Sequence, residues 1–430
     1  MKTIVKKQRE ERDKLLSIEY QERHSHAKAV LYRDSKPIKL ITGPRRAGKS
    51  VLALQMLSDK NFAYLNFDDA ALLEKFSEDA VEQALGEVYP GYEYLLLDEV
   101  QNLDGWSMWI EKLYRNGVNM VITGSNANLL SDDLAAVLSG RYVEIRLFPF
   151  SAMEYMGYLD YPVETETPSQ TAEANNRLEM FMKSGGYPEI AKTPQITSGY
   201  LSALYDAIIM KDIVRRYRVR KVEELYNVAD WLLSNLTNSF SATSLAEELG
   251  MSSVLTVQKF SGYLQNTYLF QYLPRFSNKL KLMKKADRKT YVVDNGYIMA
   301  RAFELSTNMG RLLESLVFQE LLKRGYDLKK YELFYYRSRN DKETDFVCRR
   351  GVKVERMIQV CYDMSAAKTR KREVESLVEC ASELNCSSLS IVTWNQEETI
   401  EKDGYTIKVV PLRQWILEAA KEVSLLSELR

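Results

Sequence analysis

Two glycines bracket four residues ahead of a lysine and a serine in one short segment of the chain. The segment is Gly43-Pro44-Arg45-Arg46-Ala47-Gly48-Lys49-Ser50. Such glycines let backbone N–H groups turn inward around phosphate oxygens, and a following helix adds the positive end of its dipole. Lys49 would reach the β- and γ-phosphates of a nucleotide, and the Ser50 hydroxyl would bind Mg²⁺. An apolar run at 38–42 and a helix-like run at 51–57 flank the segment, which favours a phosphate loop over a chance glycine turn.

Two neighbouring acids end an apolar run further along the chain. Leu95-Leu96-Leu97 leads into Asp98 and Glu99, as in a buried strand whose acids emerge at the edge of a sheet. Beside a phosphate loop, Asp98 would hold the Mg²⁺ shell and Glu99 would polarise an attacking water. The alternative is a strand followed by an ordinary acidic loop. The phosphate loop upstream favours the catalytic interpretation.

Two further positions are candidates for assisting hydrolysis. The segment Thr123-Gly124-Ser125-Asn126 ends the next strand, and either Ser125 or Asn126 could orient the water or sense the γ-phosphate. The alternative there is a glycine turn capped by a polar residue. Arg141 could stabilise transition-state charge, within its own chain or across a subunit contact. The alternative for Arg141 is a surface ion pair with Glu144.

Strand and helix patterns alternate over residues 37–158, after a charged helical extension at 1–36 that we expect to form one helix and a connector. Short apolar strands between helices predict a parallel sheet covered on both faces, which binds ligands at the carboxyl ends of its strands. The phosphate loop, Asp98 and Ser125 all fall there. We therefore predict an α/β P-loop NTPase domain. Its strand candidates are 38–42, 62–67, 94–98, 120–123 and 142–147.

Two more regions follow a polar, proline-containing linker at 160–171. Residues 173–295 predict a helical lid and a winged-helix domain, because a helix pair after residue 240 precedes a strand-like hairpin with a basic insert. Residues 305–430 predict a separate α/β domain. Its expected elements are a helix at 310–324, strands at 332–337, 343–349 and 354–361, a helix at 366–385 and a strand at 388–394.

These motifs together resemble a bacterial and archaeal family of AAA-type P-loop ATPases. The C-terminal domain of that family has no known function and is similar to PD-(D/E)XK nucleases. The resemblance implies ATP, Mg²⁺, an AAA-type sheet and a restriction-endonuclease-like C-terminal fold, and it leaves the physiological role open. The stretches that carry it are GPRRAGKS (43–50), LLLDEVQNL (95–103), ITGSNANLL (122–130), LSGRYVEIRLFPFSAMEY (138–155), SGGYPE (184–189), KDIVR (211–215), KTYVVDNG (289–296), LLESLVFQELL (312–322), YYR (335–337) and ETDFV (343–347).

The resemblance also implies a nuclease-like centre at Glu314, Asp345 and Gln359. Such centres hold Mg²⁺ with carboxylates and use a lysine beside the scissile phosphate. In this chain Cys361 stands where that lysine is expected, and a thiol supplies no positive charge. A scaffold or recognition role is therefore favoured over an ATP-gated nuclease. The alternative for the two acids is ion pairing with nearby arginines.

Local basic stretches at 211–221 and 278–289 are the candidate contacts for a partner. The second falls where the wing of a winged domain would lie, which suits the phosphate backbone of DNA or RNA. The alternatives are a solvated charged face and a winged domain that serves only as a lid. A protein partner and the oligomeric state are left open.

The overall composition sets limits on these assignments. The 59 Lys and Arg balance 59 Asp and Glu, so any basic surface is local. Only two histidines and four cysteines without a CxxC pair argue against a zinc site and predict buried free thiols. The N-terminus is charged, and no apolar run reaches the roughly 20 residues of a membrane span. We therefore expect a cytoplasmic protein without a membrane partner.

Overall fold

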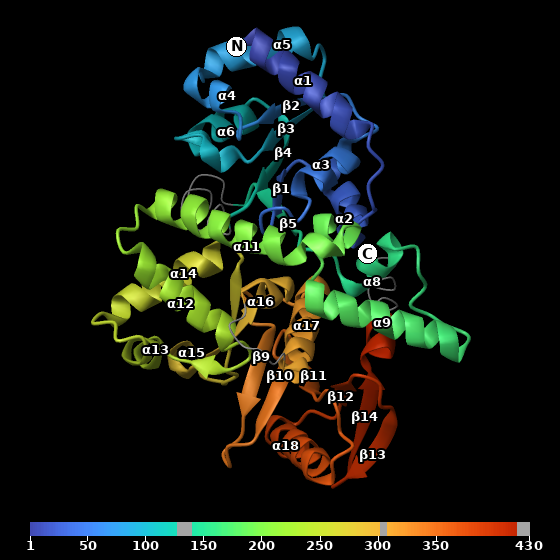
Figure 1. The fold of residues 1–430 in the computed structure, drawn as a ribbon. Coiled ribbons are helices and arrows are strands. Elements are labelled where there is room, and N and C mark those ends of the chain that lie inside the picture. The colour runs from blue at the N-terminus through green and yellow to red at the C-terminus, as the bar shows by residue number, and fades with distance from the viewer. Residues whose placement is uncertain (127–139, 302–307, 419–430) are drawn as a thin grey trace. The chain divides into compact units, whose positions relative to one another are not determined.

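The computed structural model describes residues 1–126, 140–301 and 308–418 (Figure 1). The chain divides into two compact units. One is built from Met1–Phe150 with Asn266–Tyr268, and the other from the remaining residues after Phe150. Parts of the motif stretches at 122–130 and 138–155, and parts of the predicted domain 305–430, lie outside the described residues. Of the helices that are described, none combines the length and apolar character needed to span a bilayer.

A five-stranded parallel sheet forms the centre of the first unit, in the order β2-β3-β4-β1-β5. The five strands expected from the sequence are all present and differ from expectation by at most one residue at either end. They are β1 Ile38–Thr42, β2 Phe62–Asn66, β3 Tyr94–Asp98, β4 Asn119–Gly124 and β5 Tyr142–Arg146.

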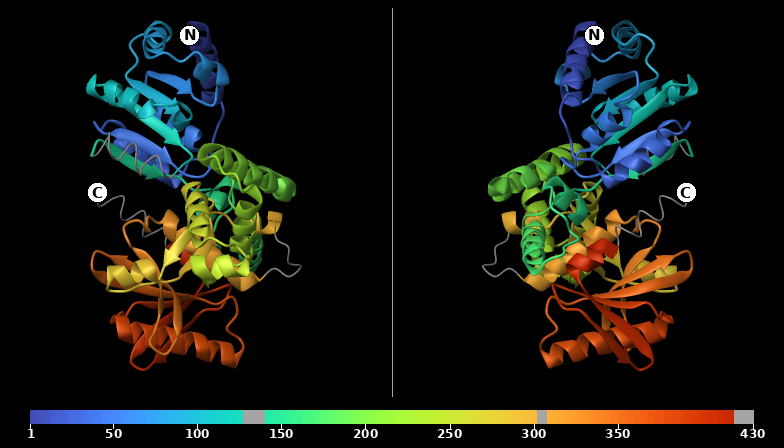
Figure 2. Two further views of the ribbon diagram at one scale, coloured as in Figure 1. Left: turned by 90° about the vertical axis from the view of Figure 1, so that its left-hand side faces the viewer. Right: turned by 90° about the vertical axis from the view of Figure 1, so that its right-hand side faces the viewer.

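Helices cover both faces of this sheet (Figure 2). Alternate side chains of one strand enter different cores, because Leu95 and Leu97 join one apolar cluster and Leu96 joins the other. This two-sided burial explains why the strands are apolar almost throughout. The helices are α1 Lys2–Leu16, α2 His24–Arg33, α3 Lys49–Leu57, α4 Ala70–Glu74, α5 Glu78–Val88 and α6 Trp106–Arg115.

The first 36 residues differ from the expected single helix and connector. They form two helices, α1 and α2, which contribute to opposite cores of the first unit: Val5 lies in one apolar cluster and Ala29 in the other. The sparse apolar residues of this charged segment are the ones that anchor it. The segment is therefore part of the first unit.

The second unit begins with helices and contains two sheets. Its helices are α8 Ala152–Tyr158, α9 Pro168–Ser184, α10 Pro188–Lys192, α11 Thr197–Ala207, a π-helix at Ile208–Arg215, α12 Val222–Ser234, α13 Ala242–Glu248, α14 Val254–Asn266, α15 Leu280–Lys285, α16 Gly296–Arg301, α17 Met309–Lys323 and α18 Ala367–Leu384. The linker expected at 160–171 ends early, because Thr167 caps α9 through a capping box with Gln170.

The smaller sheet is antiparallel, in the order β6-β8-β7. The strands β7 and β8 follow the helix pair α13–α14, as the sequence suggested, whereas β6 precedes this pair. The strands are β6 Ser239–Phe240, β7 Phe270–Pro274 and β8 Arg288–Val292. The basic helix α15 lies in the connection between β7 and β8.

The larger sheet has the order β13-β14-β12-β11-β10-β9 and mixes parallel with antiparallel pairs. Its strands are β9 Leu333–Arg337, β10 Glu343–Arg350, β11 Lys353–Val360, β12 Leu389–Thr393, β13 Glu398–Lys402 and β14 Tyr405–Pro411. The sequence did not predict β13 or β14. The strand β13 is an exposed edge strand with little apolar content, whereas β14 has buried apolar residues and was missed although its pattern was visible. Helix α18 packs against the strands β10 and β11. All four cysteines are free and buried in this region, as expected.

A buried aspartate joins two of the sequence motifs in the second unit. The Asp294 carboxylate accepts hydrogen bonds from the backbone N–H of Gly186 at 2.7 Å and of Gly296 at 2.9 Å. Gly185 has φ +86°, and a Cβ placed there would lie 1.7 Å from Asp294 Oδ1. The motifs SGGYPE and KTYVVDNG therefore form one structural joint. The first motif supplies the space at Gly185 and the N–H of Gly186, and the second supplies the carboxylate that fills that space and accepts the hydrogen bond.

We expect Gly185→Ala to destabilise the second unit by about 2–4 kcal/mol, through the clash with Asp294 and the glycine-only backbone conformation. Urea unfolding measures the change. Gly199→Ala is the matched control, because Gly199 lies in α11 and a Cβ there meets no atom within 4 Å. Equal stability of the two variants would contradict this account of the joint.

Candidate functional site

The phosphate loop leaves the carboxyl end of β1 and runs into α3. Its two glycines are required by geometry. Gly43 has φ +151°, and a Cβ there would lie 1.9 Å from the backbone oxygen of Leu147 on the neighbouring chain segment. Gly48 precedes α3 with φ +95°, a left-handed conformation that favours glycine. The backbone of the loop thus packs closely against Leu147 at Gly43 and turns sharply into α3 at Gly48.

Lys49 is almost fully buried in the loop, with 4% of its side chain exposed. Its ammonium donates a hydrogen bond to the backbone oxygen of Pro44 at 3.1 Å. The same ammonium lies 3.4 Å from Glu99 Oε1. A buried cation needs such partners, because removing it from water costs several kcal/mol. Lys49 is therefore paired inside the site itself.

Asp98 lies at the end of β3, where two hydroxyls point at one of its oxygens. Ser50 Oγ donates to Asp98 Oδ1 at 2.8 Å, and Thr123 Oγ1 donates to the same oxygen. Tyr64 OH donates to Oδ2 at 3.4 Å. Burial and the neighbouring charge of Glu99 raise the pKa of Asp98 to about 6, although the hydroxyls oppose this. The two residues predicted to hold Mg²⁺, Ser50 and Asp98, are in direct contact.

Glu99 follows Asp98 in a left-handed backbone conformation, with φ 52° and ψ 41°. Its backbone N–H donates to Thr123 Oγ1 at 3.0 Å. Its carboxylate accepts hydrogen bonds from Ser125 Oγ at 3.0 Å and from the Gln101 amide. Burial opposes ionisation, but Lys49 and the other partners hold the pKa of Glu99 below its ordinary value. Glu99 is thus a fixed, ionised carboxylate at the edge of the sheet.

Three residues at this site escaped the sequence analysis. Gln101 and Thr123 orient the two acids, as described above. Arg23 supports the loop from α2's start, donating to the backbone oxygens of Ala47 at 2.8 Å and Phe148 at 2.6 Å. Only spatial proximity identifies Arg23, because nothing in the charged N-terminal segment marks it. Thr123 and Gln101 do lie within the motif stretches, so their polar side chains next to the predicted acids could have identified them from the sequence.

Arg141 lies away from the phosphate loop. The backbone N–H of Ile38, at the start of β1, donates to its backbone oxygen, so Arg141 lies at the amino edge of the sheet. The length of β1, about 13 Å, separates that edge from the loop. The side chain contacts Glu111 at 3.4 Å. Arg141 therefore does not reach the phosphate loop of its own chain, and a catalytic role across a subunit contact stays a prediction. Glu144 pairs with Arg146 instead.

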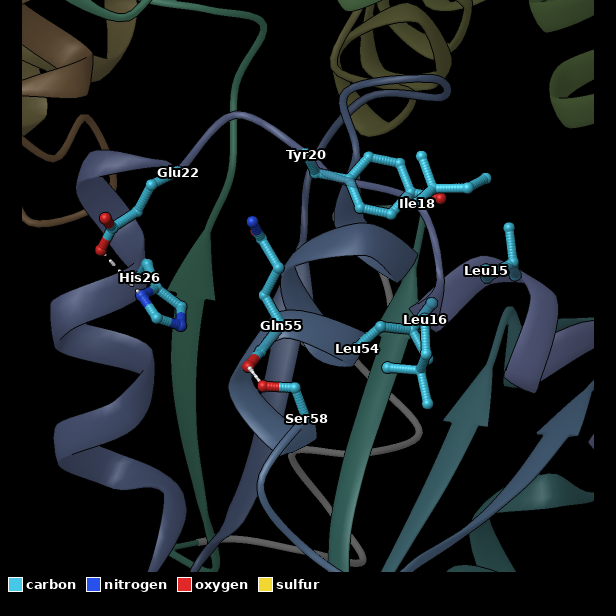
Figure 3. A pocket seen from close by; sticks show the side chains of 9 residues that line it. All are labelled: Leu15, Leu16, Ile18, Tyr20, Glu22, His26, Leu54, Gln55 and Ser58. Carbon is cyan, nitrogen blue, oxygen red and sulfur yellow. Dashed lines mark hydrogen bonds and ion pairs between the residues drawn. The ribbon is translucent and has the colours of Figure 1, made fainter.

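A pocket of about 380 Å³ lies beside the same helix α3 (Figure 3). Gln55 extends from α3 into it, between the Glu22–His26 pair and a group of apolar side chains. Gln55 Oε1 and His26 Nε2 are buried and have no hydrogen-bond partner. The pocket thus has an apolar wall, and two of the side chains that line it carry a buried polar atom without a hydrogen-bond partner. Its lining residues are Leu15, Leu16, Ile18, Tyr20, Glu22, His26, Leu54, Gln55 and Ser58.

The nuclease-like candidates form a second cluster, within the second unit. Glu314 lies on α17, Asp345 on β10 and Gln359 on β11. Glu314 and Asp345 come together around Lys289 of β8, and Gln359 Oε1 accepts a hydrogen bond from the backbone N–H of Asp345 at 3.4 Å. The sequence did not connect Lys289 with these residues. Lys289 Nζ lies 3.1 Å from Glu314 Oε1 and 2.9 Å from Asp345 Oδ1. Cys361 follows β11 with a buried thiol.

Three family models match successive parts of the chain. An AAA domain matches residues 35–156, a domain of unknown function (DUF8612) matches 175–308, and another (DUF4143) matches 309–415. Residues 35–156 are thus an AAA-like P-loop domain, which agrees with the parallel sheet and the loop. The family of the C-terminal region has no known function, so its similarity to nucleases stays a prediction.

Two relatives match nearly the whole chain, and both are uncharacterized. A Haemophilus influenzae protein is 30% identical over 406 residues, which cover 90% of this chain and 96% of the relative. A Methanocaldococcus jannaschii protein is 29% identical over 397 residues, which cover 88% of each.

Solved structures give weaker matches. A Walker-type ATPase of Pyrococcus abyssi has a TM-score of 0.45 at 14% identity, covering 66% of this chain and 99% of its own. A Thermotoga maritima RuvB variant has a TM-score of 0.29 at 16% identity, covering 57% of this chain and 85% of its own. Both TM-scores are low, so the assignment of the P-loop fold rests on the family model and the observed sheet.

The raised pKa of Asp98 makes a prediction about stability without nucleotide. Between the ordinary value of 3.8 and about 6, the folded protein keeps a proton that the unfolded chain releases, so this group lowers stability as pH rises through that range. At pH 8, Asp98→Asn should therefore be more stable than the wild type by about 1–3 kcal/mol. The difference should shrink below pH 4.

Chemical unfolding at several pH values, without Mg²⁺ or nucleotide, measures this difference. Asp104→Asn is the control, because Asp104 is exposed in a turn. A difference for Asp98→Asn that is independent of pH, or a loss of stability at pH 8, would contradict the assigned environment.

Proposed function

The chain belongs to the same family as the Haemophilus influenzae protein, and from its AAA domain we propose that it is a Mg²⁺-dependent ATPase. The observation that carries the proposal is one hydrogen-bonded group at the carboxyl edge of the sheet. In it, Ser50 contacts Asp98, Lys49 contacts Glu99, and the acids are adjacent in sequence. This set supplies a phosphate-binding cation, oxygen ligands for a metal and a base.

The residues fit a magnesium ion bound together with ATP. The Ser50 hydroxyl and the Asp98 carboxylate are both oxygen ligands of the kind Mg²⁺ prefers, and their oxygens lie 2.8 Å apart. When bound with the nucleotide, Mg²⁺ would neutralise charge on the phosphate oxygens. Asp98 then titrates lower than it does without the cation, because an adjacent positive charge favours its ionised form.

The hydrolytic step follows from the way Glu99 is held. On nucleotide binding, Lys49 exchanges its contact with Glu99 for the phosphates, which frees one carboxylate oxygen. Ser125 and Gln101 keep the other oxygen in place. Glu99 can then accept a hydrogen bond from the attacking water and orient it towards the terminal phosphate. Ser125 therefore acts by positioning Glu99.

The pocket beside α3 is our candidate for the nucleoside part of ATP. Gln55 lies six residues beyond Lys49 on the same helix, about 9 Å along its axis. That separation suits a nucleotide whose phosphates lie at the start of the helix. The unpartnered Gln55 Oε1 is an acceptor that an exocyclic amino group of a base can use.

We further propose that ATP turnover acts as a switch on the second unit. The supporting observation is that the chain consists of two separate compact units and that the ATPase residues lie entirely within the first. Hydrogen exchange with and without bound ATP would detect the coupling. Protection that changes in the second unit supports the switch, and protection confined to the first unit argues against it.

Glu99→Gln should lower the rate of ATP hydrolysis by about 10²–10⁴, because the base is lost, while ATP binding is kept. Lys49→Ala should abolish ATP binding. Phosphate release and equilibrium binding of labelled ATP measure the two effects. Glu93→Gln is the matched control, because Glu93 is exposed just before β3. Undiminished hydrolysis by Glu99→Gln would remove the proposal.

A nucleic-acid contact is the second candidate function, favoured by the basic helix α15. Lys281, Lys284 and Lys285 are exposed there, in the connection between β7 and β8. The element order, with a helix pair followed by a hairpin, suits a winged helix whose wing carries this charge. Contacts of this kind bind phosphates without base specificity and weaken with salt.

Charge reversal at Lys284 and Lys285 should weaken binding to duplex DNA or RNA and reduce the salt dependence of the affinity. Fluorescence anisotropy over a salt series measures both. Reversal at Lys368 and Lys371 of α18 is the control for net charge. Absence of binding by the wild type at low salt would eliminate this candidate.

A further inference from the structure

A nuclease-like centre at Glu314, Asp345 and Gln359 would hold a divalent cation, yet a side-chain cation already lies at its middle. Lys289 Nζ contacts three carboxylates, at 3.1 Å for Glu314, 2.9 Å for Glu343 and 2.9 Å for Asp345. Only 4% of the Lys289 side chain is exposed. Burial works against its charge, but the carboxylates hold the pKa of Lys289 above its ordinary value. The ammonium is therefore present at neutral pH.

Lys289 reaches this centre from a different sheet. It lies on β8, whose neighbours are β6 and β7, whereas Glu343 and Asp345 lie on β10 of the larger sheet. The two sheets also meet through their backbones, since Phe276 N–H donates to the backbone oxygen of Tyr335 at 2.7 Å. Tyr335 OH donates to the backbone oxygen of Asp287 at 2.9 Å. Lys289 is thus placed by several contacts besides its own ion pairs.

The carboxylates around Lys289 have further partners that complete their hydrogen bonding. Tyr291 OH donates to Glu314 Oε1 at 2.7 Å, and Arg337 pairs with Glu343 at 2.9 Å. Asp345 Oδ2 accepts from the backbone N–H of Val360 at 3.0 Å. Two cations, the Lys289 ammonium and the Arg337 guanidinium, therefore offset most of the charge of the three carboxylates without any metal.

The remaining positions of the expected centre are engaged elsewhere. The Gln359 amide donates to Glu373 Oε2 at 2.8 Å. Cys361 Sγ donates to the backbone oxygen of Asp363 at 3.3 Å, and burial raises the pKa of this thiol to about 11, so it is neutral. Within the ranges that the structure describes, no group of three His, Cys, Asp or Glu side chains is arranged to hold a metal ion.

We propose that the Lys289 ammonium permanently replaces the metal ion of this centre, so that the C-terminal domain binds no catalytic metal and is fastened to the three-stranded sheet. A divalent cation among the same carboxylates would meet a buried ammonium at close range, and that repulsion is strong where water is excluded. An ammonium has no coordination site at which a water can be activated. The second unit therefore works as one body that does not cut phosphodiesters.

Manganese binding to the nucleotide-free full-length chain tests this proposal, with electron paramagnetic resonance as the readout. The wild type should show no site that depends on Asp345. Lys289→Met removes the internal cation and should create a site for one Mn²⁺ per chain, whose affinity exceeds that of any residual Mn²⁺ binding of the wild type by about tenfold or more. Adding Asp345→Asn to Lys289→Met should abolish that site. Lys330→Met, at an exposed lysine between α17 and β9, should behave as the wild type.

Asp345-dependent Mn²⁺ binding by the wild type would overturn the proposal, as would cleavage of DNA or RNA that Asp345→Ala abolishes. If Lys289→Met folds and gains no Mn²⁺, the claim that the ammonium occupies a metal's place is also wrong. If Lys289→Met does not fold, the comparison of the wild type with Asp345→Asn decides alone. None of these outcomes depends on ATP hydrolysis, so the ATPase proposal can fail separately.

Discussion

The candidate site of each unit contains a buried ammonium that is paired with carboxylates. Lys49 and Lys289 each expose only 4% of the side chain. Removing such a charge from water costs several kcal/mol, and an unpaired one would destabilise the fold strongly. In the first unit the partner is Glu99, the residue directly after β3. In the second unit the partners come from α17 and β10.

The two lysines differ in how firmly they are held, and this difference suggests different roles. Lys49 has one carboxylate contact, at 3.4 Å, and one backbone acceptor. A nucleotide's phosphates offer more negative charge than that and can displace Glu99. Lys289 has three carboxylate contacts at 2.9–3.1 Å, supplied by two elements, α17 and β10. No single ligand replaces all three, so the first lysine can be exchanged and the second is fixed.

The sequence predicted the features that depend on local patterns. The five parallel strands, the loop 43–50 and the acids at Asp98 and Glu99 were recognised because apolar runs and motif spacing are local. Features that depend on long-range contacts were missed. Arg23 reaches the loop across a long stretch of chain, and its segment carries no pattern that marks it. The strand β13 lacks the apolar alternation that a half-buried strand shows.

The lysine that is missing at the position of Cys361 is a further example of a feature that depends on long-range contacts. From the sequence its absence argued for a weak centre. The structure brings in Lys289 from a strand that precedes the C-terminal domain in the sequence, and only the pairing of two sheets places it there. Asp294 is similar, because its role as the acceptor for Gly186 and Gly296 is visible only once two distant motifs are in contact.

The most direct test of this account follows the ammonium groups themselves. Nuclear magnetic resonance of ¹⁵N-labelled lysine side chains, with Lys49 and Lys289 assigned through Lys→Arg variants, reports on each ion pair separately. The account predicts that Mg²⁺ with a non-hydrolysable ATP analogue shifts the Lys49 signal, and that Mg²⁺ alone, even in large excess, leaves the Lys289 signal unchanged. A Lys49 signal that ignores the nucleotide, or a Lys289 signal that shifts with Mg²⁺ alone, would contradict it.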